Sequence, residues 1–133
     1  MRRGVLLLCA AIALGGCATP SVQSVKQTQG KGVKRTFRHP YDAVYPAVLE
    51  AIAKRKLELD EEDRASGFVV ASSGKTRTSL GERIAVFVTR NSDRSTTVEV
   101  VSKAAGGPLT FPPDWAALLF GDIDQELTVR RPK

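Results

Sequence analysis

The residue types that most often carry out catalysis or bind metals are scarce in this sequence of 133 residues. It contains two cysteines, Cys9 and Cys17, and a single histidine, His39. No serine or cysteine stands at a recognisable spacing from His39 to form a nucleophilic pair, so we expect a structural or solvated imidazole. So few cysteines and histidines also exclude a disulfide scaffold and a zinc site of the Cys/His type. The sequence therefore predicts a protein that is not an enzyme and holds no cofactor or metal.

Two short stretches imitate ligand-binding motifs without matching them. Residues 60–63 (DEED) place four acids in a row, but they lack the alternating spacing and the glycine of a calcium loop. A solvated turn is the preferred interpretation. Residues 74–76 (GKT) imitate the end of a phosphate-binding loop, yet that motif requires glycine at position 69, which is Val69. We therefore predict neither a calcium site nor a nucleotide site.

Residues 111–115 (FPPDW) are the strongest candidate for a binding site. They place two large aromatic side chains beside two prolines, where the last predicted helix meets the rest of the chain. The first interpretation is that Trp115 packs in the core. The second is a groove between the last helix and the sheet, lined by Phe111, Trp115 and Leu119, that takes a peptide, a lipid or a glycan.

The first sixteen residues have the pattern of a secretory signal. Residues 1–4 carry two arginines, and residues 5–14 have no charge and are nearly all apolar. An apolar run of this length is about half of the roughly 20 residues that a membrane-spanning helix needs. A basic start, a short apolar run and small residues are instead typical of a signal peptide that is cleaved.

Residues 14–17 (LGGC) resemble the lipobox of bacterial lipoprotein precursors. The resemblance implies cleavage after Gly16 and three acyl chains on Cys17, which becomes the first mature residue. Two or more acyl chains make a membrane attachment stable. The residue after the cysteine is Ala18 and not aspartate. By the enteric sorting rule, a lipoprotein without aspartate at this position moves on to the outer membrane, so the resemblance implies that location. The alternative is ordinary cleavage after Gly16, which leaves Cys17 as a free thiol.

The remaining chain divides into a tether, a domain and a tail. Residues 1–16 carry two of the 20 basic residues and no acid, so the net charge falls from +6 to +4. The basic residues are scattered, and we expect no nucleic-acid partner. Residues 17–34 are polar and aperiodic, which predicts a lipidated cysteine and a flexible tether of at most about 60 Å. A folded domain is expected over residues 35–129 and a basic tail over residues 130–133.

Apolar periodicity predicts an α+β domain with the order β-α-β-β-β-β-α. An apolar face repeats at helical spacing over residues 41–56 and again, every four residues, over residues 115–127. Alternating apolar residues predict strands near residues 34–38, 57–59, 67–71, 84–88 and 96–102. Pro113 and Asp114 suit the start of the last helix. Because an antiparallel sheet with one apolar face needs a cover, we expect both helices to pack on one face.

The domain resembles a family of small proteobacterial lipoproteins with a helix-grip-like domain, of which the BamC-type lipoprotein of the outer-membrane β-barrel assembly machine is one example. The residues that carry the resemblance are Phe37, Pro40, Asp42, Val44, Tyr45, Ala47, Val48, Leu57, Leu59, Gly67, Phe68 and Val69. They describe a strand, a helix and a hairpin, and not a chemical site. The partner that BamC-type proteins bind through a long extended segment is not implied, because the segment here is far shorter.

Together these features predict a non-enzymatic lipoprotein of the outer membrane, with its domain in the periplasm. Its expected partners are the membrane, through the lipid on Cys17, and an envelope protein of unknown identity. We expect a role in envelope assembly or protein interaction. The alternative is a lipoprotein that binds a small ligand in the groove under the last helix.

Overall fold

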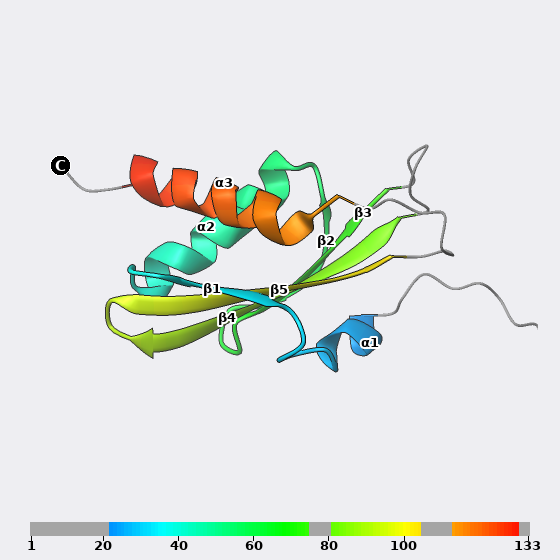
Figure 1. The fold of residues 1–133 in the computed structure, drawn as a ribbon, viewed down its shortest axis with the longest axis horizontal. Helices are drawn as coiled ribbons and strands as arrows, with labels where there is room; N and C mark the ends of the chain where they lie inside the picture. The colour runs from blue at the N-terminus through cyan, green and yellow to red at the C-terminus, as the bar shows by residue number, and fades with distance from the viewer. Residues whose placement is uncertain (1–21, 75–80, 105–112, 131–133) are drawn as a thin grey trace, which may run out of the picture.

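The computed structural model describes residues 22–74, 81–104 and 113–130. In these ranges the chain forms three helices and five strands (Figure 1). Their bounds are α1 Val22–Lys26, β1 Val33–Phe37, α2 Tyr41–Lys54, β2 Glu58–Asp63, β3 Phe68–Ser73, β4 Glu82–Ser92, β5 Ser95–Ala104 and α3 Trp115–Val129. None of these helices has the length and apolarity required to cross a bilayer. From β1 onward, the predicted order β-α-β-β-β-β-α is confirmed.

The five strands form one antiparallel sheet in the order β1-β5-β4-β3-β2. Tight connections join β2 to β3 and β4 to β5, whereas β1 crosses over to pair with β5, so that Val33 lies opposite Val100. The edges of the sheet are therefore β1 and β2. Strands β4 and β5 are the longest, and each pairs with a neighbouring strand on both sides.

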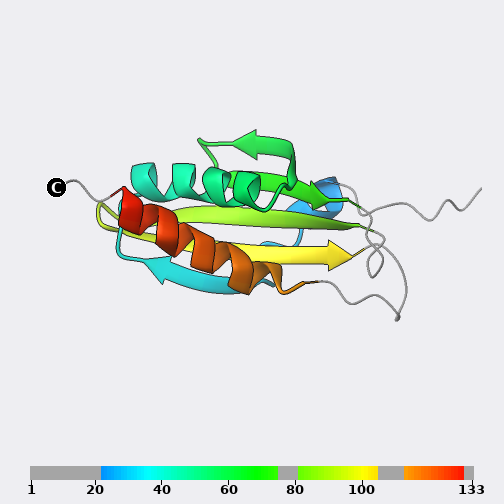
Figure 2. The ribbon, with the colours of Figure 1, turned by 90° about the horizontal axis from the view of Figure 1, so that it is seen from above.

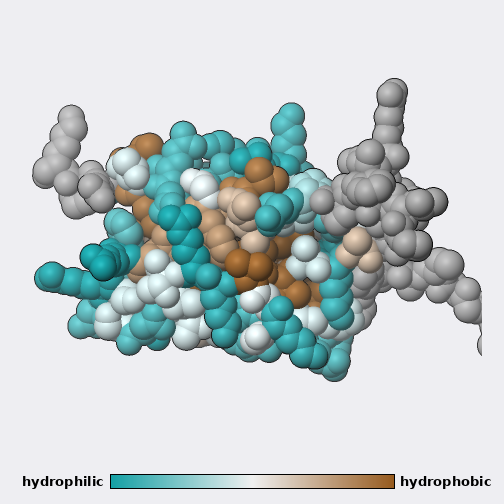
Figure 3. Space-filling view, viewed as in Figure 1, coloured by the Kyte–Doolittle hydropathy of each residue, from teal (hydrophilic) through white to brown (hydrophobic). Residues whose placement is uncertain are grey.

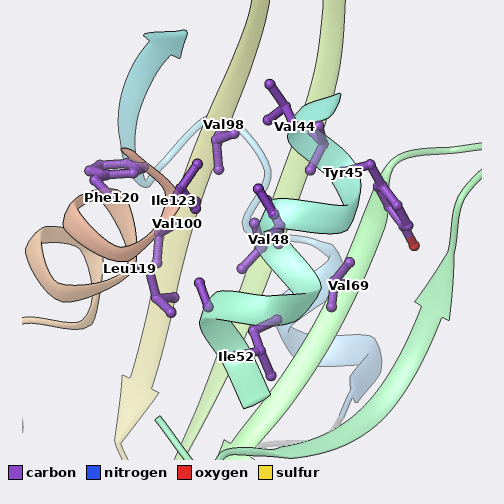
Figure 4. Packing of buried hydrophobic residues seen from close by; sticks show 14 of the residues in the cluster. Val44, Tyr45, Val48, Ile52, Val69, Val98, Val100, Leu119, Phe120 and Ile123 are labelled. Atoms are coloured by element: carbon purple, nitrogen blue, oxygen red, sulfur yellow. The ribbon is translucent and has the colours of Figure 1, made fainter. Parts of the chain in front are cut away.

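Helices α2 and α3 lie side by side over one face of the sheet (Figure 2). The core between helices and sheet is apolar, and Leu119 and Ile123 of α3 approach Val98 and Val100 of β5 (Figure 4). The predicted fold class is confirmed: an α+β domain whose two main helices share one face. The spacing that predicted α3 is confirmed too, because its stripe is buried: Trp115, Leu119, Ile123 and Leu127.

The opposite face of the sheet carries α1, which corrects the predicted flexible tether over residues 17–34 in its described part, from residue 22 onward. Val25 of α1 is fully buried, and it packs in a second apolar cluster with Phe68 and Phe87. The reason is that the central strands are apolar on both faces, so the second face also requires a cover. Structure therefore begins by Val22 within the described residues, and β1 begins at Val33, ahead of the predicted domain start at residue 35.

The loop between α1 and β1 is held by a buried carboxylate. Glu99 of β5 is 5% exposed and accepts hydrogen bonds from the backbone N–H groups of Gly30 at 2.6 Å and Gly32 at 3.0 Å. Lys26 adds an ion pair with Glu61 at 2.5 Å and stacks over Phe68. Charged partners therefore reinforce the apolar contact of α1.

The acidic run of residues 60–63 lies in β2, which corrects the predicted turn. Pairing with β3 extends this strand to Asp63, opposite Phe68. Its acids are tolerated because β2 is an edge strand and because several have partners: Lys26 pairs with Glu61, and Ser72 donates to Asp60. A row of charges on an edge strand also disfavours pairing with another sheet.

Candidate functional site

Trp115 occupies the first turn of α3, and the local sequence explains its position. Asp114 is the N-cap, and its side chain accepts a hydrogen bond from the backbone N–H of Ala117 at 3.1 Å. Pro113 precedes the cap and is not the first helical residue, which shifts the predicted helix start by two residues. Trp115 is 9% exposed, and its indole Nε1 donates to the carboxylate of Glu82. Trp115 therefore belongs to the core, as the first interpretation predicted.

A shallow hollow of about 270 Å³ nevertheless lies beside Trp115. It is bounded by Trp115 and Ala116 of α3, by Val33 of β1 and by the end of β5 around Val101. In Figure 3 apolar side chains gather on the surface in the region between α3 and β1. The hollow lies beyond the first residue of β1, because Val33 pairs with Val100 whereas β5 continues to Ala104. In the described residues, the part of β5 after Val100 therefore has no neighbouring strand on the β1 side.

The predicted groove residues do not all line this hollow. Leu119 is 1% exposed and lies in the core under α3, so its assignment to the groove is corrected: four residues after Trp115 it shares the buried face of the helix. Phe111 lies outside the described residues. Of the two groove residues that the structure describes, Trp115 lines the hollow and Leu119 does not.

A larger recess, of about 720 Å³, lies where the start of α2 faces the β2–β3 turn and the far part of β4. It is lined by Tyr41 and Asp42 of α2, by Arg64 and Ser66 of the turn, and by Arg90 of β4, among others. The guanidinium carbon of Arg90 lies 5.2 Å from the centre of the Tyr41 ring. Stacking of this kind positions a guanidinium and leaves its N–H edge available for an anion. We call this site the arginine recess.

Hydrogen bonds fix the tyrosines and Arg64 around the arginine recess. The Tyr41 hydroxyl donates to the backbone carbonyl of Arg64 at 2.6 Å, and burial raises the pKa of Tyr41. The Tyr45 hydroxyl donates to Glu62 at 3.1 Å, and burial together with that carboxylate raises the pKa of Tyr45 as well. Both phenols therefore stay neutral at physiological pH.

The charges of the arginine recess favour an anion. Arg64 lies 3.2 Å from Asp42, so one of its two lining arginines already has a carboxylate partner. Arg90 has no carboxylate partner among the described residues. An incoming carboxylate or phosphate would therefore meet one unpaired guanidinium and a second one shared with Asp42.

Of the other candidates of the sequence, those that lie in the described residues form no site. His39 lies between β1 and α2, where its backbone carbonyl accepts a hydrogen bond from Thr96 at 2.9 Å. In the described parts of the chain no three His, Cys, Asp or Glu side chains are grouped to hold a metal ion. Gly16, Cys17 and residues 75–76 of the phosphate-loop imitation lie outside the described residues.

The sequence did not point to the arginine recess. Tyr41, Arg64 and Arg90 come from three separate elements, and none stands in a recognisable motif. They meet because the β2–β3 hairpin folds back against β4, where Gly67 makes an exceptionally close approach. The backbone N–H of Val88 donates to the Gly67 carbonyl at 2.7 Å, and Gly67 has φ +72°. Gly67, at the start of the predicted strand over residues 67–71, was the one local signal in the sequence, and a glycine there marks only a turn.

No protein-family model and no curated protein sequence matches this chain. Among solved structures, it is similar to the adenylate sensor of AMP-activated protein kinase, with 10% identity, a TM-score of 0.48, and coverage of 73% of this chain and 94% of that one. It is also similar to Ara h 8.0201, with 11% identity, a TM-score of 0.49, and coverage of 74% and 96% respectively.

Proposed function

We propose that this protein is a lipoprotein of the bacterial outer membrane whose periplasmic domain is a non-enzymatic interaction module. The observation that carries the proposal is the start of the chain: two arginines, ten uncharged residues and then Leu14-Gly15-Gly16-Cys17. In the described domain, apolar side chains of α2 and α3 fill the core against the sheet, and the arginine recess lies at the surface.

The surface that we propose for partner contact is the arginine recess. Arg90 is exposed, stacked and without a carboxylate partner in the described residues, and Arg64 is 57% exposed at its side chain. A partner that presents a carboxylate or a phosphate would form charge-assisted hydrogen bonds with both guanidinium groups. The partner class is therefore an envelope protein with an acidic contact segment.

The anchor is tested by metabolic labelling with radioactive fatty acid. Cys17→Ser removes the thiol that receives the lipid, so labelling should be lost and the precursor should accumulate. Cys9→Ser is the matched control, because Cys9 lies in the apolar part of the signal, and its labelling should match that of the wild type. Normal cleavage and absence of label in the wild type would contradict the proposal.

The contact surface is tested by crosslinking in intact cells. A photoreactive residue at Thr89, which is exposed and lines the arginine recess, should attach to the partner. Arg90→Glu should reduce that product at least about tenfold, since charge reversal replaces attraction by repulsion. Arg94→Glu is the control, because Arg94 is exposed in the β4–β5 turn but does not line the recess. Equal products from both variants would exclude the recess.

A second candidate function is binding of a small ligand (a lipid, a peptide or a glycan) in the hollow beside Trp115. The observation that favours it is the position of that hollow, bounded by Val33, which is 58% exposed, and by Trp115. Ala116→Trp would fill the hollow from α3. It should abolish ligand binding if this function holds and should leave the crosslink at Thr89 unchanged if the first function holds.

A further inference from the structure

The docking of α1 leaves very little chain between the lipid-bearing cysteine and the folded domain. Only residues 18–21 separate Cys17 from Val22, the first residue of α1. Five residue steps span at most about 17 Å, even when fully extended. If residues 22–32 hung free, the link from Cys17 to Val33 would instead reach about 55 Å. The contacts of α1 therefore decide how far the domain can lie from its anchor.

These contacts are specific enough to hold the segment on the sheet. Val25 is fully buried in the apolar cluster of the second face. Glu99 binds two backbone N–H groups of the following loop, at 2.6 and 3.0 Å, and Lys103 donates to the backbone carbonyl of Ser24 at 3.3 Å. Any side chain at Gly32 would meet the backbone of Val100 at 2.4 Å, so the loop passes directly over β5.

The position of α1 also gives the domain a direction. Lys103 lies near the end of β5, so its bond to Ser24 places α1 at the end of the sheet where β5 finishes and α3 begins (Figure 1). The β4–β5 turn lies at the opposite end of the same strands. With ten residues in β5, that turn is about 30 Å farther along the sheet.

We propose that the docked α1 seats the domain directly on the phospholipid surface that holds its lipid anchor, with the α1 end of the sheet toward the bilayer. This inference rests on the proposed anchor at Cys17. Trp115 and Lys103 are at the bilayer end, whereas Arg90, next to the β4–β5 turn, is at the end that points away from it. The arginine recess is thereby presented to the periplasmic space and not to the lipid.

Trp115 is the only tryptophan in the chain, which makes it a natural donor for a distance measurement. The full-length lipidated protein is placed in vesicles that contain a dansyl-labelled phospholipid, and energy transfer from Trp115 is measured. The wild type should show strong transfer. Twelve Gly/Ser residues inserted between Ser21 and Val22 should reduce the transfer efficiency at least about twofold, because the link lengthens while α1 stays docked.

A second variant tests the docking itself. Val25→Asp combined with Glu99→Ala removes the buried apolar contact of α1 and the acceptor of the two loop N–H groups, and this variant too should reduce transfer at least about twofold. Its circular dichroism shows whether α2, α3 and the sheet persist. The same twelve-residue insertion after Arg130, beyond α3, is the matched control and should leave transfer unchanged.

The outcomes separate this inference from the anchor on which it rests. A wild type that carries lipid and floats with the vesicles, yet transfers no better than the insertion variant, overturns the seated domain and leaves the anchor intact. A wild type that neither carries lipid nor floats overturns both. Strong wild-type transfer that falls in the two variants and persists in the control supports the inference.

Discussion

Arg55, immediately after α2, donates two hydrogen bonds to the carboxylate of Asp122 on α3, at 2.6 Å from Nε and 3.0 Å from Nη2. Lys54 lies 3.4 Å from the same carboxylate, which is 6% exposed. The bonds from Arg55 outweigh the effect of burial and lower the pKa of Asp122 below its usual value of 3.8. The two helices of the helical layer are thus joined by a charged contact at the edge of an apolar core.

Asp122→Asn should destabilise the domain by about 2 kcal/mol near neutral pH, because it removes the charge from two hydrogen bonds. Since the folded pKa lies below the unfolded one, this stability is present above about pH 4 and is lost as the pH falls through the folded pKa. Urea unfolding between pH 7 and pH 3 should therefore show a difference from wild type that shrinks in acid.

Asp124→Asn is the control for that measurement. Asp124 is on the same helix and pairs with Arg35, but its side chain is 47% exposed, so the change should cost less than about 0.5 kcal/mol. A difference for Asp122→Asn that is equal at pH 7 and pH 3 would contradict the assigned role of its charge.

Val25→Ala should destabilise the domain by about 1.5 kcal/mol, because two fully buried methyl groups are lost from the cluster under α1. A segment that packed on nothing would leave the free energy of unfolding unchanged. Val22→Ala is the matched control in the same helix, and its smaller burial should give a smaller effect. Chemical denaturation of the two variants decides between a docked helix and a flexible tether.

Trp115→Ala should cost about 3–5 kcal/mol through lost burial and a residual cavity. The wild-type indole, 9% exposed, should show blue-shifted fluorescence that is shielded from a soluble quencher. Trp115→Phe keeps a six-membered ring in the core and loses the rest of the indole, including the Nε1 donor to Glu82, so it should cost less than Trp115→Ala. Red-shifted emission together with a stable Ala variant would place Trp115 in a groove and not in the core.

Gly67→Ala should destabilise the domain by more than about 2 kcal/mol. Its φ of +72° disfavours a side chain, and an added Cβ would lie 2.0 Å from the carbonyl oxygen of Val88. Gly121→Ala provides the contrast, because a Cβ there meets nothing within 4 Å. In the middle of α3 it should stabilise by up to about 1 kcal/mol. The melting temperature should fall for Gly67→Ala and rise for Gly121→Ala, and a shift in the same direction for both variants would contradict this account.

Local signals in the sequence were sufficient for the class and order of the elements. The four-residue spacing from Trp115 to Leu127 specifies a helix with one buried face, and the alternation around Val86 and Val98 specifies strands. Each signal depends only on neighbours in the chain, which is why the order β-α-β-β-β-β-α was predicted correctly. The signal peptide and the lipid on Cys17 are sequence patterns of the same local kind, and they stay predictions that the labelling experiment tests.

Tertiary structure alone decided what lies on the second face of the sheet and at its far end. Val22 and Val25 are two isolated apolar residues in a polar segment, and they form a helix only because Phe68 and Phe87 offer an apolar surface. A five-residue helix cannot be stable without such a contact. In the same way, Tyr41, Arg64 and Arg90 become one recess only when the sheet places them together, because pairings between distant segments leave no trace in local spacing.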